Sequence, residues 1–412
     1  MHRASILLVA AITLPACADR ETATMPSSEA GDAAAIHAAA LTLDTHVDID
    51  LDFATEAIDP LDADIQVNLQ KMRAGGLDTA FFVVYVGQTE RTRENYARAQ
   101  ADAMTKFEAI HRMTNTLYPD LIGLAYRAAD VERLVSEGKL AAAIGVENGY
   151  AIGTDLGLID RYYELGARYL GLVHNGHNDL ADSASPRPRF GDAEIEHGGV
   201  SELGAAAIRR MNELGIMVDI SHASKQTALD TIALSQAPVI ASHSSVHALG
   251  NHVRNLDDET LLRLRDNGGV VQIVAFDIYI NVRPAEFFEA RGALRESLGL
   301  QGFVDPAQLD EDIREAYERG MAEIDARWSP ADVAAFVDHI DYVVDLIGID
   351  HVGISSDFGG GGGINGWSDA AETPNVTAEL LARGYSAEDI EKIWSGNLLR
   401  VWREVEAVAA RL

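Results

Sequence analysis

The chain has 412 residues, of which 47% are hydrophobic, so it is long enough for one large barrel or two domains with a full core. Its 64 acidic and 33 basic residues give a formal charge of -31, which repels phosphate backbones and anionic membrane surfaces. These values exclude a disordered chain and a transmembrane array, and they argue against nucleic acid as a partner.

The N-terminus has the order of a secretory signal peptide, with an apolar stretch over residues 6–13 that is too short to span a bilayer. The following quartet, Leu14-Pro15-Ala16-Cys17, resembles a bacterial lipoprotein processing site. It predicts a signal peptide over 1–16 and lipid attachment at Cys17, the only cysteine of the chain. An ordinary cleaved signal with an incidental cysteine is the alternative.

This interpretation places the protein outside the cytoplasm. We expect an exported bacterial lipoprotein on the periplasmic face of a membrane, which it would contact only through the lipid anchor. The polar, small-residue segment that follows predicts a flexible tether over residues 17–37.

From residue 38 onward, apolar runs typical of strands alternate with amphipathic helical stretches such as 92–114, 201–214 and 330–346. The predicted strands span about 40–48, 78–86, 140–147, 168–174, 216–222, 238–243, 269–275 and 350–357. Eight strands in this alternation predict an α/β TIM barrel, (β/α)8, over residues 38–412. A doubly wound open sheet also fits the alternation, but it would spread the strand ends along a line.

Two segments depart from the simple repeat. Residues 281–328 are rich in Glu, Arg and Ala with helical spacing, which predicts a helical insertion before the last strand. It forms either a wall of the pocket or a surface elaboration. The run from Gly359 to Gly363 lets the backbone approach a ligand closely, or it is a mobile loop.

Several predicted strands end in residues that bind metals. His46 and Asp48 lie two positions apart, so in a strand both side chains point to the same side. The other strand ends carry Glu147, His174, His222, His243 and Asp357. In a TIM barrel these ends meet at one mouth, where the imidazoles and carboxylates suit Zn²⁺ or a similar ion. The surplus of carboxylates indicates a bridged pair of ions.

These motifs, taken in order, resemble the membrane (renal-type) dipeptidases, peptidase family M19 of the amidohydrolase superfamily, over roughly residues 40–402. The resemblance rests on these segments: His46-Val47-Asp48, Gly145-Val146-Glu147, Leu172-Val173-His174-Asn175, Val218-Asp219-Ile220-Ser221-His222, Ser242-His243-Ser244-Ser245, Arg254-Asn255 and Asp350 to Phe358.

The resemblance implies a role for each matching residue. His46, Asp48 and Glu147 would hold one zinc ion, and Glu147, His222 and His243 the other, with Glu147 as the bridge. A hydroxide between the two ions would attack the peptide carbonyl. The remaining implied roles are a proton shuttle at Asp357, a carbonyl-polarising donor at His174, a carboxylate-binding group at Arg254 and a pocket residue at Tyr279.

The family resemblance also implies dipeptide substrates, often with a D residue accepted at the second position, and it leaves room for a homodimer, since members commonly dimerise. In the loop after the last strand, many members have an Asp where this chain has Gly359, which puts polar contacts of that loop in doubt.

Two other functions remain open. Another amidohydrolase, such as a lactonase, amidase, phosphotriesterase or deaminase, would often use His-x-His and a carbamylated lysine. A non-catalytic exported binding protein would hold no zinc.

Overall fold

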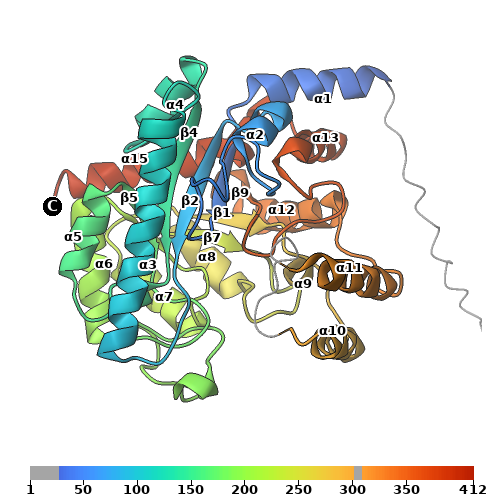
Figure 1. The fold of residues 1–412 in the computed structure, drawn as a ribbon. Helices are drawn as coiled ribbons and strands as arrows, with labels where there is room; N and C mark the ends of the chain where they lie inside the picture. The colour runs from blue at the N-terminus through green and yellow to red at the C-terminus, as the bar shows by residue number, and fades with distance from the viewer. Residues whose placement is uncertain (1–26, 301–308) are drawn as a thin grey trace, which may run out of the picture.

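A computed structural model describes residues 27–300 and 309–412, which form a parallel β-barrel surrounded by helices (Figure 1). The predicted signal peptide and Cys17 lie outside the described residues. The strands are β1 Leu43–Asp48, β2 Thr79–Tyr85, β3 Ile122–Leu124, β4 Leu140–Glu147, β5 Ala167–Gly171, β6 Met217–Asp219, β7 Ile240–Ser244, β8 Val270–Val274 and β9 Val352–Ser355.

Eight of these strands follow one another around the barrel in the order β1-β2-β4-β5-β6-β7-β8-β9, and every pair is parallel. The barrel closes between its last and first strands, where Asp357 N donates to His46 O at 3.1 Å and Asp48 N donates to Phe358 O at 2.8 Å. This closure confirms the predicted TIM barrel, and the alternative of an open doubly wound sheet is wrong.

The strand β3 was not predicted from the sequence. It pairs with the beginning of β4, opposite Leu140 to Ala142, whereas β5 pairs with β4 only from Ile144 onward. The short strand thus satisfies backbone groups at the start of β4 before β5 begins.

The barrel interior and its outer layer form two separate apolar clusters. Inside the barrel, Phe81 and Tyr169 pack with Trp402 and Leu398 of the last helix, so this helix closes the barrel at the end opposite the mouth. On the outer face, alternate residues of the same strands, such as Phe82 and Ile144, pack against the surrounding helices. Among the described residues, the mouth is therefore the end of the barrel that the last helix leaves open for a polar site.

The helices are α1 Ser27–Ala39, α2 Leu69–Gly75, α3 Arg93–Arg112, α4 Ala128–Ser136, α5 Gly157–Glu164, α6 Glu202–Leu214, α7 Lys225–Leu234, α8 Asp258–Asp266, α9 Asp277–Ile280, α10 Ala285–Ser297, α11 Glu311–Asp325, α12 Val333–Ile347, α13 Pro374–Ala382, α14 Ala387–Glu391 and α15 Asn397–Ala409. Helix α6 illustrates how residue types set where a helix begins and ends. At its start the Ser201 hydroxyl accepts from Gly204 N, and at its end Gly215 adopts the left-handed conformation with φ 85°. None of the described helices is long and apolar enough to cross a membrane.

The tether predicted over 17–37 is wrong for its last part, because residues 27–39 form α1, which lies beside α13 (Figure 1). The imidazole of His37 is buried between these elements, with hydrogen bonds to Thr377 Oγ1 at 2.7 Å and Gly75 O at 2.8 Å. The folded part therefore begins before residue 38.

The segment 281–328 contributes α10 and α11, which pack against each other beside the barrel (Figure 1). Both helices line a cavity that also contacts β1 and the glycine loop after β9. Of the two roles left open by the sequence, the structure therefore supports a pocket wall.

Candidate metal centre

The residues predicted to bind metal meet at the mouth of the barrel. They come from the carboxyl ends of separate strands or from the residues just beyond them: His46 and Asp48 in β1, Glu147 in β4, His222 after β6, His243 in β7 and Asp357 after β9. Parallel strands place their carboxyl ends at one edge of a barrel, which explains why residues so distant in sequence converge.

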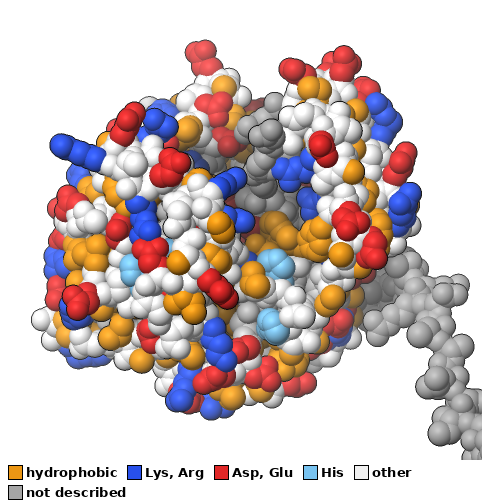
Figure 2. Space-filling view, turned by 90° about the horizontal axis from the view of Figure 1, so that it is seen from below, with side chains coloured by type: hydrophobic (Ala, Val, Ile, Leu, Met, Phe, Trp, Pro, Cys, Tyr) orange, Lys and Arg blue, Asp and Glu red, His pale blue; other side chains and the backbone are white. Residues whose placement is uncertain are grey.

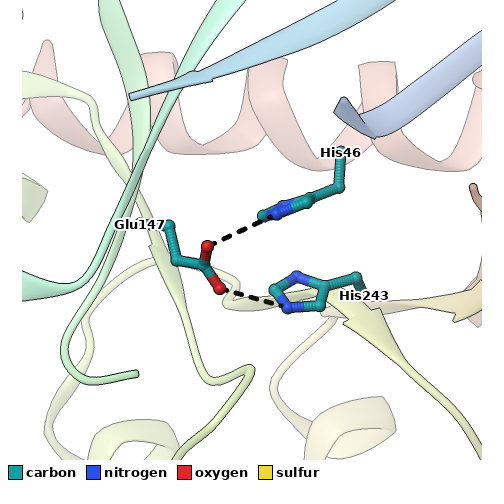
Figure 3. A group of neighbouring side chains, drawn as sticks. All are labelled: His46, Glu147 and His243. Atoms are coloured by element: carbon teal, nitrogen blue, oxygen red, sulfur yellow. Dashed lines mark ion pairs between the residues drawn. The ribbon is translucent and has the colours of Figure 1, made fainter. Parts of the chain in front are cut away.

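The carboxylate of Glu147 lies at the centre of this group and faces imidazoles on two sides (Figure 3). Its Oε2 lies 3.6 Å from His46 Nε2, while its Oε1 lies 3.0 Å from His222 Nε2 and 3.3 Å from His243 Nε2. The imidazole of His46 also faces Asp48, whose Oδ2 lies 3.4 Å from His46 Nε2. Glu147 therefore joins two sets of donors.

The donor set fits divalent metal ions. Within the described residues, buried His46 Nε2 has no hydrogen-bond partner, although it faces carboxylates at ion-pair distances. Two ligand atoms about 2.1 Å from one tetrahedral ion lie about 3.4 Å apart, which matches the spacing of His46 and Asp48. Among the described residues, three overlapping groups have ligand atoms that all lie within 4.8 Å of one another: His46, Glu147 and His243; Glu147, His174 and His222; and His46, Asp48 and Asp357.

Hydrogen bonds behind two histidines set their tautomers. The Tyr169 hydroxyl donates to Thr45 O at 3.1 Å, so it accepts from His46 Nδ1 at 2.9 Å. The Ser242 hydroxyl donates to Asp219 Oδ2 at 2.6 Å and accepts from His243 Nδ1 at 2.8 Å. In the neutral form of each ring the proton is therefore on Nδ1, and Nε2 is the nitrogen that can bind a metal ion in the site.

The supporting residues Tyr169 and Asp219 were not predicted from the sequence. Asp219 had a visible signal, because it stands at the end of β6 within the motif that contains His222. In the sequence, Tyr169 fits the apolar pattern of β5 and gives no sign of a polar role. Only the folded barrel shows that its hydroxyl faces His46.

Burial and neighbouring charges shift the pKa values in the site. Burial lowers the pKa values of His222 and His243, which keeps these imidazoles neutral. Burial raises the pKa of Glu147, but the surrounding histidines outweigh it and hold that pKa well below its usual value. For Asp357, burial raises the pKa well above its usual value, and the nearby Asp48 and Glu147 charges act in the same direction.

His174 lies at the accessible edge of the site. Its Nε2 is 4.0 Å from Glu147 Oε1, farther than the other imidazoles, and its side chain is 18% exposed compared with 5% for His222. On its other side, Tyr85 Oη lies 3.5 Å from His174 Nδ1. A histidine in this position can donate to a substrate atom.

Arg254 and Tyr279 lie together at another side of the mouth. Arg254 is buried and donates from Nη2 to His243 O at 3.1 Å, while its Nε has no hydrogen-bond partner in the part of the chain that the structure describes. Its guanidinium lies 5.3 Å from the ring centre of Tyr279, which belongs to α9 directly after β8. The pair offers a cation with unused hydrogen-bonding capacity close to His243.

Three residues of the site have strained backbones. Asn148, which follows Glu147, has φ 77°, and His222 and Asp357 have φ 65° and 58°. Non-glycine residues rarely adopt this left-handed region, and each costs about 1–3 kcal/mol. The predicted strands 216–222 and 350–357 therefore extend too far, since a residue with positive φ cannot continue the ladder. Both side chains leave the strands and turn into the mouth.

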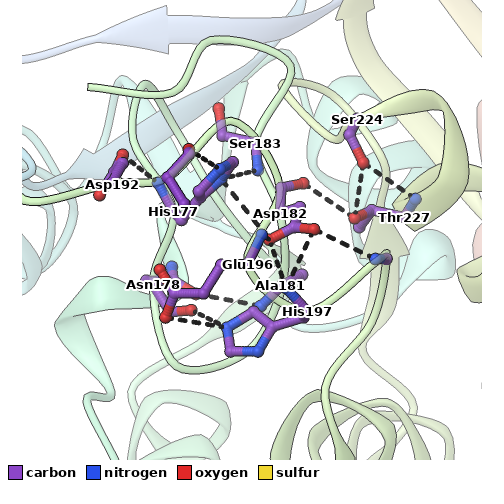
Figure 4. Close-up of polar contacts among 12 residues, drawn as sticks. His177, Asn178, Ala181, Asp182, Ser183, Asp192, Glu196, His197, Ser224 and Thr227 are labelled. Carbon is purple, nitrogen blue, oxygen red and sulfur yellow. Dashed lines mark hydrogen bonds and ion pairs between the residues drawn. The ribbon is translucent and has the colours of Figure 1, made fainter. Parts of the chain in front are cut away.

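The loop after β5 is held together by hydrogen bonds and ion pairs among its polar residues (Figure 4). The carboxylate of Asp182 accepts from the backbone N–H groups of residues 196–199, and His177 Nδ1 accepts from Ser183 N at 2.9 Å. The Ser183 hydroxyl donates to His174 O, and Ala184 N donates to His222 O at 2.8 Å. The loop thus holds the backbone of both histidines.

The glycine run after β9 packs against the site rather than standing away from it. A Cβ on Gly360 would contact Asp48 Oδ2 and lie 2.7 Å from Asp357 Oδ1, and a Cβ on Gly359 would lie 2.6 Å from Asp48 O. Close approach of the backbone to these two acids, one of the alternatives seen in the sequence, is what the structure shows.

Comparison with known proteins agrees with this geometry. The family model described as membrane dipeptidase (peptidase family M19) matches residues 31–412. The chain belongs to the membrane dipeptidase family. As a member of family M19, it is a metallopeptidase that hydrolyses peptide bonds, and the predicted family is confirmed.

Individual relatives of this M19 protein are named dipeptidases. The curated Dipeptidase aclJ of Aspergillus oryzae is 35% identical over 352 residues, which cover 84% of this chain and 72% of that protein. Dipeptidase tcpJ of Claviceps purpurea is 32% identical over 349 residues, covering 84% and 70%. These identities favour a peptidase over the lactonase, deaminase and binding-protein alternatives.

The crystal structure of the probable dipeptidase PvdM from Pseudomonas aeruginosa is 35% identical to the M19 protein, with a TM-score of 0.82 over 93% of this chain and 100% of that one. A metallopeptidase from Rhodobacter sphaeroides, solved with a phosphinate mimic of the dipeptide L-Ala-D-Ala, has 22% identity and a TM-score of 0.68 over 88% and 99%. The second likeness shows the shared fold.

Proposed function

We propose that this protein is a dipeptidase that uses two zinc ions bridged by Glu147. The proposal rests on the position of the Glu147 carboxylate, whose two oxygens face two different sets of possible metal ligands. Oε2 faces His46, beside Asp48, and Oε1 faces His222 and His243. Imidazole nitrogens and carboxylate oxygens in these numbers suit Zn²⁺.

When bound, the two ions would supply a Lewis acid and a water molecule that loses its proton near neutral pH. The protein would supply the proton transfers. The Asp357 carboxyl lies beside the donor set, with Oδ1 3.8 Å from His46 Nε2. Its raised pKa suits a group that accepts a proton from water and delivers it to the leaving amine.

His174 and Arg254 would bind the substrate. An Nε2–H of His174 would donate to the carbonyl oxygen as negative charge develops there. The planar guanidinium of Arg254 would pair with the terminal carboxylate of a dipeptide, since its buried Nε has no partner in the described protein. A cation fixed at this depth favours dipeptides over longer chains.

The stereochemistry at the second residue is part of the proposal. A protein with the same fold binds a mimic of L-Ala-D-Ala, which supports acceptance of a D residue next to the carboxylate. We therefore propose that both L,L and L,D dipeptides are hydrolysed.

Metal analysis and a dipeptide assay test the proposal together. The purified protein should contain two zinc ions per chain, lose hydrolysis of L-Ala-L-Ala and L-Ala-D-Ala on chelation, and regain it when zinc is restored. Alaninamide derivatives, which lack the terminal carboxylate, should react about 100-fold more slowly, as expected for a lost buried charge pair.

A matched pair of variants provides the control. Glu147→Gln should lose both metal and activity, whereas Glu379→Gln in α13, whose carboxylate contacts Arg383 at 2.7 Å far from the mouth, should retain both. Full activity in metal-free protein, or no hydrolysis of any dipeptide by the zinc-loaded protein, would contradict the proposal.

We further propose export and lipid attachment at Cys17, on the strength of the apolar stretch and the quartet that precede it. Cells that express the full chain should incorporate labelled fatty acid into it. The Cys17→Ser variant should take up no label and leave the membrane fraction; labelling that survives this substitution would refute the attachment site.

A further inference from the structure

A large cavity adjoins the metal centre. Its volume is about 1500 Å³, larger than the roughly 300–1,000 Å³ typical of sites for drug-sized ligands. It begins at Asp48 and the glycine loop and extends to α10 and α11. Figure 2 shows this side of the molecule hollowed, with basic side chains along the hollow. A simple dipeptide would leave most of this space empty.

The far wall of the cavity is packed and tied to the barrel. Leu294 of α10 lies against Gly320 of α11, where any larger residue would clash with it. Arg283, just before α10, pairs with Asp277 of α9, which also accepts from Ala331 N at 2.7 Å. The insertion is thus fixed at both of its ends, so it can present side chains at defined positions.

Half-buried arginines distinguish this cavity, and we call them the arginine wall: Arg187, Arg291, Arg295 and Arg314. Within the described residues, none of their guanidinium groups forms an ion pair or a hydrogen bond with a carboxylate. Other arginines of the same insertion do so, as Arg283 does with Asp277 and Arg319 with Glu315. In a chain with 64 acidic and 33 basic residues, four arginines around one cavity that form no ion pair with a carboxylate of the described residues indicate an anionic ligand.

The described lining also contains six acidic residues: Asp48, Asp50, Asp64, Glu296, Glu318 and Asp369. Asp48 faces His46 at the metal centre, Asp50 is not free, and Asp369 is held by Lys71 at 3.0 Å. The side chains of Asp64, Glu296 and Glu318 are exposed to solvent. Arg291 and Arg295 are four residues apart in α10, so both lie on the same face of the helix. Together with Arg314 of α11, they place positive charge at the far wall of the cavity, where solvent screening is reduced.

The position of the cavity indicates which part of a substrate would enter it. Its lining includes Asp48 but neither Arg254 nor Tyr279. Because Arg254 is assigned to the terminal carboxylate, the second residue of a dipeptide would lie on that side of the metal centre. The side chain of the first residue would then point toward the cavity.

We propose that the arginine wall binds an anionic group at the end of a long side chain on the first residue, so that the enzyme selects dipeptides with acidic substituents. This specificity rests on the proposed dipeptidase function. The ligand chemistry is a carboxylate or a phosphate, both of which arginine binds through paired hydrogen bonds.

Two dipeptides of nearly equal length test the charge preference, namely Lys-Ala with the side-chain amine succinylated or butyrylated, and unmodified Lys-Ala serves as a shorter, cationic reference. The succinyl and butyryl groups differ chiefly in the terminal carboxylate. The wild-type protein should hydrolyse the succinyl compound with a kcat/KM about tenfold above that of the butyryl compound, as expected for charge-assisted hydrogen bonds in a partly buried site. This ratio should fall as salt is raised.

Variants of the wall should reduce the ratio. In the Arg291→Gln/Arg295→Gln double variant, and separately in Arg187→Gln, the succinyl-to-butyryl ratio should fall toward one, mainly through an increased KM for the succinyl compound. The matched control is Arg319→Gln, an exposed arginine of α11 outside the cavity, which should keep the wild-type ratio.

The outcomes separate this inference from the function on which it rests. Equal kcat/KM values for the succinyl and butyryl compounds in active wild-type protein would overturn the arginine wall and leave the dipeptidase intact. A ratio that survives in both sets of folded variants would also overturn it. Failure to hydrolyse any of the three compounds, together with Ala-Ala, would refute the dipeptidase function itself.

Discussion

The hydroxyl of Tyr169 allows a sharp test of the metal centre, because it acts on His46 from behind. It accepts from His46 Nδ1 at 2.9 Å and donates to Thr45 O at 3.1 Å, and the side chain is fully buried. The Tyr169→Phe substitution keeps the ring in the barrel core and removes only this hydroxyl. His46 then loses the acceptor that fixes its tautomer.

The magnitude follows from the two bonds that are lost. A buried polar group left without its partner costs about 1–3 kcal/mol, so the free energy of unfolding of the metal-free protein should fall by that amount. Loss of a hydrogen bond behind a metal-binding histidine typically reduces metal affinity by about 10–100-fold. The more weakly held ion should be the one that His46 and Asp48 share.

The assay is a zinc competition titration against a chelator of known affinity, with unfolding by denaturant measured in parallel. The control is Tyr162→Phe, which removes another buried tyrosine hydroxyl, one that donates to Ala151 O at 3.0 Å. Tyr162→Phe should lower stability by about 1 kcal/mol without changing zinc affinity. If both variants bind zinc as the wild type does, the hydroxyl does not position His46 for a metal and the reasoning fails.

Further predictions concern the glycine loop, a buried histidine and the proton shuttle. Gly360→Ala should reduce kcat by more than about tenfold, because its Cβ would displace the Asp48 carboxylate. Gly292→Ala, whose Cβ would meet no described atom within 4 Å, should keep the wild-type kcat. Equal activities of the two variants would show that the glycine loop can shift to accept the Cβ. Burial lowers the pKa of His339 from 6.5 to about 4, so stability is full above pH 6.5 and is lost as the pH falls toward 4. At pH 5 the loss is about 2 kcal/mol, and denaturant unfolding of His339→Asn should lack this component. Asp357→Asn should retain its zinc and lose about 10²–10⁴ in kcat, and a zinc-depleted variant would instead make Asp357 a ligand.

Much of the fold could be predicted from the sequence because its barrel strands are short apolar runs separated by amphipathic helices. Runs such as Leu140–Glu147 are buried on both faces, and this pattern is visible in one dimension. The strand β3 escaped prediction because three residues carry no periodic signal. The limits of β6 and β9 were wrong because the positive φ of His222 and Asp357 cannot be read from residue type.

The residues of the site also fall into those that could be predicted from the sequence and those that could not. His46, Glu147 and His243 could be named in advance, because polar residues that end apolar strands contradict the hydrophobic pattern. Tyr85 and Tyr169 were missed, since a tyrosine in a strand fits that pattern and gives no sign of its hydroxyl partner. The role of the insertion could not be decided either, because a helical pattern shows which face is apolar but not which element lies opposite.

The sequence by itself determined the alternation of strands and helices, the residues able to bind metal, and the family to which they belong. These properties are local, since they depend on residue type and on spacing along the chain. The tertiary structure alone decided that the barrel closes between β9 and β1, that Glu147 divides its oxygens between two donor sets, and that the arginine wall faces the same mouth. Each of these depends on contacts between residues far apart in the chain, and such contacts are fixed only when the strands close into a barrel.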